Sequence, residues 1–450
     1  MEIEIISREC IKPSSPTPHH LRTHKISLVD QFGTPMFVST INFYLPNQVA
    51  GSVSKRSQVL KQSLSKTLTL YYPVAGKIID TLSIDCNDEG VSYMVARVNC
   101  NLRDYLRKPD LSKLPKFVPG EIIASEMTLG AHVAMIQETV FACGGFSIGL
   151  VIPHHFFDGN STIVFLKNWA TIARQEAPQA PDFSSSYMFP QNTSFPQDPI
   201  SSTVGRLVFG QEGTFVLRRF VFEGLAVSNL KAKATRSGVP NPTRVEVVVA
   251  LLLKCIMSAL SAKSPPRKSA LISTTVNLRR RVVPPFPETT VGNLVLLTPI
   301  LANSEETDSR SFLHLMSESI SPINGEFLKS LQGDQGLQRL SEYVEELRES
   351  FRKASSDGAE TIVFNSWCNS GIYNADFGWG KPIWFPAVAS ALPLRGSVIQ
   401  LTDTRMSNGI EAWVSLDEEI MSMVEHDEEL LSIASVDPSP LEIDSLKSKL

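Results

Sequence analysis

The sequence predicts an α/β protein with two domains, and three observations lead to this prediction. The chain has 450 residues, which is more than one hydrophobic core usually holds, so two domains are expected. Hydrophobic residues make up 42% of the chain, which suits a compact globular protein. Short strand-like runs alternate with segments whose apolar residues recur at helical spacing. Helices and strands are therefore expected along the whole chain.

The first predicted helix lies within residues 55–77. Leu60, Leu64 and Leu68 are four residues apart there and would share one helical face. A proline and a glycine in the following Tyr-Pro-Val-Ala-Gly stretch break the helical pattern. Residues 82–98 then predict two strands, because the Asn-Asp-Glu-Gly sequence between two apolar runs is typical of a turn.

Two more strands and a helix complete the first half of the chain. Residues 132–153 predict two strands joined at a Gly-Gly pair. Residues 160–175 predict a helix, for which Asn160 or Ser161 would supply the N-cap.

A change of composition marks the boundary between the predicted domains. Residues 176–204 are rich in Pro, Ser and Gln and show no periodicity, and their prolines disfavour both helix and central strand. We interpret this segment as a long crossover linker. It separates an N-terminal domain, residues 1–175, from a C-terminal domain, residues 205–450.

The second half of the chain repeats the mixture of helices and strands. Residues 243–260 predict a strong helix whose first turn has capping-box spacing between Thr243 and Glu246. Two strands and an amphipathic helix follow, at residues 270–278, 292–300 and 337–353.

Charge and cysteine content exclude several classes of partner. A net charge of −4 and a pI near 6.1 give no reason to expect nucleic-acid binding. No apolar stretch in the sequence approaches the length of a membrane span, and the N-terminus lacks the features of a signal peptide. The six cysteines form no CxxC pair, so neither a zinc site nor a disulfide framework is expected. A cytosolic protein without a membrane, metal or nucleic-acid partner is the simplest interpretation.

The stretch with the most chemistry is GLVIPHHFFDGNS, residues 149–161. His154 and His155 end an apolar run, and Asp158 follows four residues after the first histidine. These side chains could pack, bind a metal or catalyse a reaction. His155 would point away from its neighbour on a strand and is assigned to packing. A metal site lacks a convincing third ligand.

Catalysis by a serine nucleophile is a second possibility in the same region. Residues 145–149, GFSIG, match the GxSxG pattern of serine hydrolases, with Ser147 as nucleophile. That pattern requires a helix directly after the serine. The residues that follow here continue as a strand, so Ser147 is interpreted as an ordinary strand residue, and a serine esterase is kept only as an alternative function.

The remaining possibility is that His154 is a general base. A histidine followed four positions later by aspartate is weak evidence, because eight histidines give on the order of half such a match by chance at average composition. Independent support comes from residues 373–382, YNADFGWGKP, which contain a rare Asp-Phe-Gly-Trp-Gly sequence.

Together, HHFFDG at residues 154–159 and DFGWG at residues 376–380 resemble the signature motifs of the BAHD family of plant acyl-CoA-dependent acyltransferases. The resemblance extends over essentially the whole chain, and within the family it is strongest to the vinorine synthase-like branch of alkaloid and terpenoid acetyltransferases. Other stretches that resemble the family are IKPSSPTP at 11–18, YYPVAGK at 71–77, VNLRRR at 276–281 and VGN at 291–293.

The resemblance implies a specific architecture. Two similarly sized α/β domains, each like the core of chloramphenicol acetyltransferase, would carry mixed sheets flanked by helices and enclose a central solvent channel. The catalytic histidine would lie in mid-channel, with donor and acceptor approaching from opposite faces.

The resemblance also assigns roles to the motif residues. His154 would be the general base, and Asp376 is the second candidate catalytic residue, although the family places its loop away from the base and gives that loop a mainly structural role on the CoA side. Trp379 is a candidate for oxyanion stabilisation or for the CoA side through its indole N–H. Structural support would come from Asp158 paired with Arg279, and from Gly159 and Gly378.

The implied activity is acyl-CoA-dependent O-acylation of a plant specialised metabolite. Acetyl-CoA is the expected co-substrate and an alkaloid or a triterpenoid of the limonoid type the expected acceptor, with no bound cofactor and a monomeric protein. Alternatives are the serine esterase and a catalytically silent binding protein of the same fold. The sequence does not identify the acceptor or its reacting hydroxyl.

Overall fold

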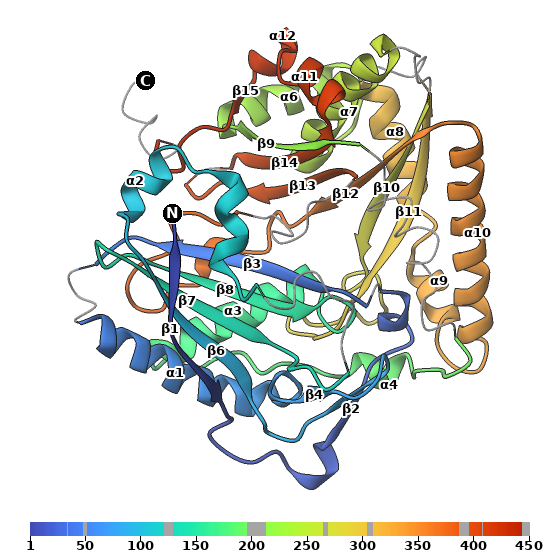
Figure 1. Cartoon of the computed structure of the whole chain (residues 1–450). Coiled ribbons are helices and arrows are strands. Elements are labelled where there is room, and N and C mark those ends of the chain that lie inside the picture. Colours follow the sequence, from blue (N-terminus) through green and yellow to red (C-terminus); the bar gives the residue numbers. More distant parts are fainter. Residues whose placement is uncertain are drawn as a thin grey trace.

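A computed structural model of the chain describes most residues and has the predicted mixed α/β architecture (Figure 1). Two large sheets, each packed against helices, make up the molecule. The described ranges are 1–33, 35–47, 52–120, 129–195, 213–263, 269–303, 309–386, 396–406 and 408–442.

The first large sheet has five strands in the order β1-β6-β7-β8-β3. Among the described strands of this sheet, the β6–β7 pair is parallel and the other neighbouring pairs are antiparallel. Its strands are β1 (Ile3–Ile11), β3 (Phe37–Tyr44), β6 (Val91–Val98), β7 (Met135–Phe141) and β8 (Phe146–Pro153). Beside it lie α1 (Val53–Leu70), α2 (Leu102–Arg107), α3 (Gly159–Ala173) and a small sheet of β2 (Thr23–Lys25), β4 (Lys77–Ile78) and β5 (Ser83–Asp85).

The second large sheet has seven strands in the order β11-β10-β12-β13-β14-β9-β15, with β10, β12 and β13 parallel to one another. They are β9 (Phe215–Phe222), β10 (Ser269–Asn277), β11 (Val295–Asn303), β12 (Glu360–Ser366), β13 (Ser397–Asp403), β14 (Ile410–Asp417) and β15 (Ala434–Val436). The helices of this half are α6 (Gly224–Arg236), α7 (Arg244–Ala262), α8 (Ser309–Ile320), α9 (Gly325–Ser330), α10 (Gly336–Ser356), α11 (Glu418–Val424) and α12 (Glu428–Leu431).

Several local predictions are confirmed. Leu60, Leu64 and Leu68 are fully buried on the inner face of α1. The Gly-Gly pair joins β7 to β8 as an antiparallel hairpin. Thr243 caps α7, and a reciprocal bond from its own backbone N–H to Glu246 completes the capping box.

The predicted N-cap of the helix after the HHFFDG stretch is wrong. The cap of α3 is Asp158, whose side chain accepts a hydrogen bond from the backbone N–H of Ser161. Asn160 and Ser161 lie within the first turn instead. A carboxylate at this position suits the positive end of the helix dipole.

The sequence analysis expects no apolar stretch as long as a membrane span, but α7 is such a stretch. By length and composition this helix could cross a membrane, and 67% of the relevant segment is buried inside the protein. Val248, Leu252 and Ile256 are among its fully buried residues in the core of the second sheet. A core helix passes the same test, so α7 is weak evidence for a membrane span.

The two halves of the chain are interlocked through a C-terminal segment that packs on the first sheet. Trp384 forms a bridge with Phe43 on the free edge of β3. The Phe43 N–H donates to the Trp384 carbonyl at 3.0 Å, and the Ile383 N–H donates to the Phe43 carbonyl at 2.7 Å. Residues 372–385 thereby join the core of the first sheet. Of the predicted linker, residues 176–195 are described and contain α4 (Ser185–Met188), whereas residues 196–204 lie outside the described residues.

Candidate active site

His154 lies directly after β8, a strand that pairs with β3 on one side and β7 on the other. Its backbone N–H donates to the carbonyl oxygen of Met36 at 2.7 Å, which extends the β3–β8 pairing by one residue. The backbone at position 154 is therefore held by a central strand. The residue as a whole is only partly buried.

The environment of His154 favours the neutral imidazole. Burial lowers the pKa of His154 below its ordinary value. Its own carbonyl, the charge of Asp158 and the side chain of Asn293 act in the opposite direction and favour the protonated ring. Burial is the larger effect, so the ring is neutral at pH 7 and can accept a proton.

His155 has a different environment. It is 2% exposed, and its ring packs against that of Phe156 with centroids 3.8 Å apart. Burial, and next the neighbouring charge of His154, lower the pKa of His155 to about 3. In the described part of the chain neither ring nitrogen has a hydrogen-bond partner. These features agree with the assignment of His155 to packing.

Asp158 forms the ion pair with Arg279 that the sequence led us to expect. The two side chains meet through two bonds, Nη1–Oδ2 at 2.6 Å and Nη2–Oδ1 at 3.1 Å. Arg279 is fully buried and Asp158 is 3% exposed. The pair therefore joins the start of α3 to the segment after β10 in a desolvated environment.

The remaining bonds to the Asp158 carboxylate are also structural. Oδ1 accepts from the backbone N–H of Ser161 at 2.8 Å, and Oδ2 accepts from that of Leu294 at 3.1 Å. With the two bonds from Arg279, both oxygens each have two donors. Asp158 thus acts on His154 through its charge, and none of these four bonds to its carboxylate comes from that ring.

The Val-Gly-Asn segment at residues 291–293 is tied to the same place. The carbonyl of Gly292 accepts from the backbone N–H of Asp158 at 3.2 Å and from Ser161 Oγ at 2.8 Å. Asn293 is 1% exposed, and its side chain raises the pKa of the His154 imidazole. The sequence had marked this segment only as a resemblance, with no role for the asparagine.

Gly159 leaves room for a tryptophan that sequence reasoning missed. An ideal Cβ at position 159 would lie 2.5 Å from Nε1 and Cε2 of Trp367. The indole of Trp367, which follows β12, therefore packs directly against the residue after Asp158. Its sequence context, a single Trp in Asn-Ser-Trp-Cys-Asn, gave no usable signal.

The DFGWG loop, which carries the candidates Asp376 and Trp379, lies at the opposite end of β8 from His154. The ring of Trp379 packs edge-on against Phe146 with centroids 5.9 Å apart, and Tyr44 Oη donates to the carbonyl of Ala375 at 2.8 Å. Phe146 and Pro153 begin and end β8, and seven steps of roughly 3.3 Å separate them by about 23 Å. Asp376 and Trp379 are therefore about a strand length away from the imidazole of His154.

Asp376 instead holds its own loop together. Its Oδ1 accepts from the backbone N–H of Gly378 at 2.8 Å and of Gly380 at 2.9 Å. Both glycines have positive φ, +99° and +102°, which a residue with a side chain rarely adopts. Arg174, the C-cap residue of α3, donates to the Asp376 carbonyl and connects the loop to the end of the helix.

Ser147 is confirmed as an ordinary strand residue. It lies inside β8 with no exposed surface, and its hydroxyl has no hydrogen-bond partner in the described residues. A nucleophile elbow needs an exposed serine on a strand-to-helix turn. The serine esterase alternative is therefore wrong.

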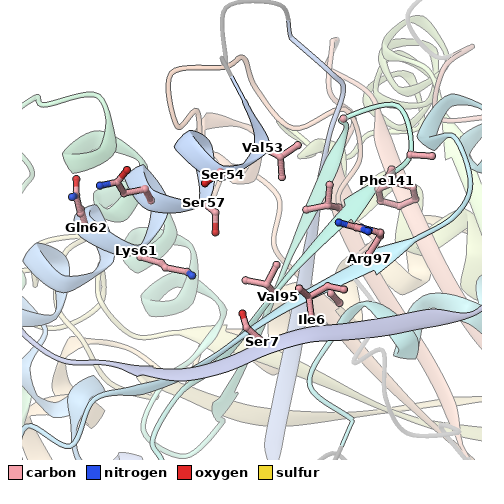
Figure 2. A pocket seen from close by; sticks show the side chains of 15 residues that line it. Ile6, Ser7, Val53, Ser54, Ser57, Lys61, Gln62, Val95, Arg97 and Phe141 are labelled. Carbon is pink, nitrogen blue, oxygen red and sulfur yellow. The ribbon is translucent and has the colours of Figure 1, made fainter.

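A separate groove of about 830 Å³ opens between α1 and the first sheet. Figure 2 shows Val53 and Ser57 of α1 facing Ile6 of β1 and Arg97 of β6 across it. The groove also reaches Gly144 in the β7–β8 turn. It thus lies near the Phe146 end of β8, away from His154. Among the described residues, no cluster of three or more His, Cys, Asp or Glu side chains could hold a metal ion.

Comparison with known proteins places the chain in one family. A model described as the Transferase family matches residues 1–431. The chain is 43% identical to an epi-neemfruitin B 7-O-acetyltransferase of Melia azedarach and 43% identical to a limonoid 7-O-acetyltransferase of Citrus sinensis. Each match covers 98% of this chain and 100% of the relative.

Solved structures share the same fold. The crystal structure of vinorine synthase is similar with a TM-score of 0.78 at 29% identity, over 96% of this chain and 99% of that chain. A structure of TRI101 of F. sporotrichioides complexed with coenzyme A and T-2 is similar with a TM-score of 0.64, over 92% of this chain and 99% of that one. At 17% identity this second likeness concerns the fold alone. The predicted two-domain acyltransferase fold is confirmed.

Proposed function

Because the chain belongs to the Transferase family, the BAHD acyltransferases, we propose that it transfers an acetyl group from acetyl-CoA to a hydroxyl of a limonoid-type triterpenoid, with His154 as general base. The acceptor class is supported by the two relatives at 43% identity, both of which are named as 7-O-acetyltransferases. Acyl-CoA is a co-substrate in this proposal, and no resident cofactor is needed.

The observation that carries the mechanism is the state of His154. His154 is a residue of intermediate exposure, its imidazole is neutral at pH 7, and its backbone is fixed by a central strand. The ring takes the proton of the acceptor hydroxyl, and the oxygen attacks the thioester carbonyl of acetyl-CoA. The tetrahedral intermediate collapses with loss of the CoA thiolate, which receives the proton from the imidazolium. The products are the acetyl ester and free CoA, and His154 returns to its neutral form.

The geometry supports different roles for the other predicted residues. Asp158, Arg279 and Gly159 fix the start of α3 beside His154. Asp376 and Gly378 shape the distant DFGWG loop, so we assign them structural roles. Trp367 replaces Trp379 as the candidate indole donor to the oxyanion, because it packs against the residue after Asp158.

A monomeric, cytosolic enzyme is part of the same proposal. All six cysteines are free in the structure, which suits a reducing compartment.

The test is release of free CoA thiol from acetyl-CoA with purified protein and hydroxylated acceptors. We expect turnover with limonoids that carry a free 7-hydroxyl and a gain of one acetyl group in product mass. Little turnover is expected with indole alkaloid alcohols. If an alkaloid alcohol supports thiol release and none of the tested limonoids does, the proposed acceptor class is contradicted. If no acceptor supports thiol release, a silent binding protein is favoured.

His154→Ala should reduce turnover by about 100-fold or more, the order that a general base contributes. His155→Gln is the matched control, because His155 is buried against Phe156 and does not take part in the proposed chemistry. It should keep most of the activity. Near-normal turnover of folded His154→Ala protein would contradict the mechanism.

A further inference from the structure

We propose that Asn293 is a positioning residue that orients the imidazole of His154 and stabilises the imidazolium formed when His154 takes the acceptor's proton. The inference rests on the proposed function, since it assigns a partner to the base. It is built from the backbone, the space and the hydrogen bonds around Asn293.

The backbone of Asn293 is fixed on both sides. Its N–H donates to Oδ1 of Asp30 at 2.5 Å, and the N–H of the next residue, Leu294, donates to the Asp158 carboxylate at 3.1 Å. The N–H of Gly292, on the other side, donates to Ser161 Oγ at 3.1 Å. Residues 292–294, which are far from His154 in the sequence, are thus hydrogen-bonded to the start of α3.

The space for the Asn293 side chain is created by a glycine. An ideal Cβ at Gly33 would lie 2.2 Å from Nδ2 of Asn293 and 3.2 Å from Cα of His155. Gly33 has an ordinary φ of −68°, so its backbone does not require glycine. The missing side chain therefore serves to admit the carboxamide next to the His154–His155 backbone.

The carboxamide oxygen lacks a partner in the resting enzyme. Oδ1 of Asn293 is buried and accepts no hydrogen bond from the described residues. Leaving a buried acceptor unpaired is unfavourable, because the oxygen has lost its hydrogen bonds to water without gaining a partner. The protonated ring of His154 would supply the missing donor, and the Asn293 side chain acts to raise the pKa of His154. The imidazolium is thereby stabilised relative to the neutral ring.

Other charged groups nearby do not supply this contact. Asp158 raises the pKa of His154 through its charge, but its oxygens are bonded to Arg279 and backbone N–H groups. Burial raises the pKa of Asp30 to about 6, and its bonds go to the backbone of Ser27 and Asn293. His155 is neutral and buried. The carbonyl of His154 itself also favours the protonated ring, so among the neighbouring side chains Asn293 is the one placed to accept directly from it.

The test measures the pH dependence of kcat/KM, whose acid limb reports the pKa of the free enzyme's base. Asn293→Ala removes a contact that raises the pKa of His154, so the acid limb should move to lower pH. kcat should fall roughly 10-fold or more, the order found when the hydrogen-bonding partner that orients a metal-ligating histidine is removed. Asn293→Asp places a carboxylate there and should move the limb to higher pH.

Two further variants separate positioning from general damage to the core. Gly33→Ala crowds the carboxamide and should move the acid limb in the same direction as Asn293→Ala. Asn42→Ala is the matched control, because Asn42 is also 1% exposed with an unpaired buried Oδ1, but lies toward the other end of β3. Its acid limb should stay in place.

An NMR titration of the His154 ring in labelled protein makes the result independent of turnover. A lower titration midpoint in Asn293→Ala and a higher one in Asn293→Asp support the inference. An unchanged midpoint in both folded variants overturns it, even if activity falls. The proposed function fails by a different result, namely normal turnover of His154→Ala.

Discussion

Asp158 and Arg279 illustrate at the residue scale how a motif carboxylate serves structure rather than proton transfer. The Asp158 oxygens receive bonds from the Arg279 guanidinium and from two backbone N–H groups, and both side chains are almost completely buried. Such a pair is weak evidence for net stability, but removal of one partner leaves the other charge unpaired in a low-dielectric environment. This asymmetry leads to a specific prediction.

Asp158→Asn should lower the free energy of unfolding by about 3–5 kcal/mol, the typical cost of breaking a buried pair. Thermal unfolding measured by circular dichroism would show a lower melting temperature. The control is Glu288→Gln, which removes the partner of Arg280 from an exposed pair with side chains 82% and 49% accessible. That change should leave the melting temperature nearly unaltered. Equal effects of the two substitutions would argue against the assigned role of the Asp158–Arg279 pair.

The DFGWG loop, at the scale of elements, is a turn that closes on the carboxylate of Asp376. The loop is anchored to β3 through Tyr44, to β8 through Phe146 and to α3 through Arg174. Its contribution is therefore to join the C-terminal segment to the first sheet. The chemistry at His154 is a strand length away.

Two substitutions of Asp376 separate a structural role from a chemical one. Asp376→Ala removes the acceptor for the N–H groups of Gly378 and Gly380, and it should destabilise the protein by about 1–2 kcal/mol. Asp376→Asn keeps an acceptor oxygen in place and should retain most of both stability and turnover. Differential scanning fluorimetry and the thiol-release assay measure the two properties. Inactive but fully stable Asp376→Asn protein would restore a catalytic role.

The elements that the sequence predicted well are those with local causes. The buried leucines of α1, the capping box of α7 and the Gly-Gly hairpin depend on residues within one or two turns of each other. The cap of α3 was misassigned, because Asp158 was considered only as a possible catalytic or ion-pair residue. Asn293 and Trp367 were missed for a different reason. The proximity of Asn293 to His154 and of Trp367 to Gly159 is created by tertiary packing and leaves no spacing pattern in the sequence.

At the scale of the whole molecule, the site is assembled from both halves of the chain. His154 and Asp158 come from the end of the first sheet, whereas Arg279, Asn293 and Trp367 come from segments of the second half. A base held between two bodies can receive donor and acceptor together. Holding both reactants in line converts a bimolecular step into an effectively unimolecular one.

This arrangement predicts direct transfer in a ternary complex. A covalent route needs a nucleophile within hydrogen-bond reach of the base. In the described part of the chain, no Ser, Cys or Thr side chain is hydrogen-bonded to His154. Ser147 is fully buried within β8. Double-reciprocal plots with acetyl-CoA and the acceptor alcohol varied together should therefore intersect. Intact-protein mass spectrometry should show no acetylated enzyme after incubation with acetyl-CoA alone. Parallel plots, or an acetyl adduct that passes into product when the alcohol is added, would show instead that the acyl group first rests on the protein.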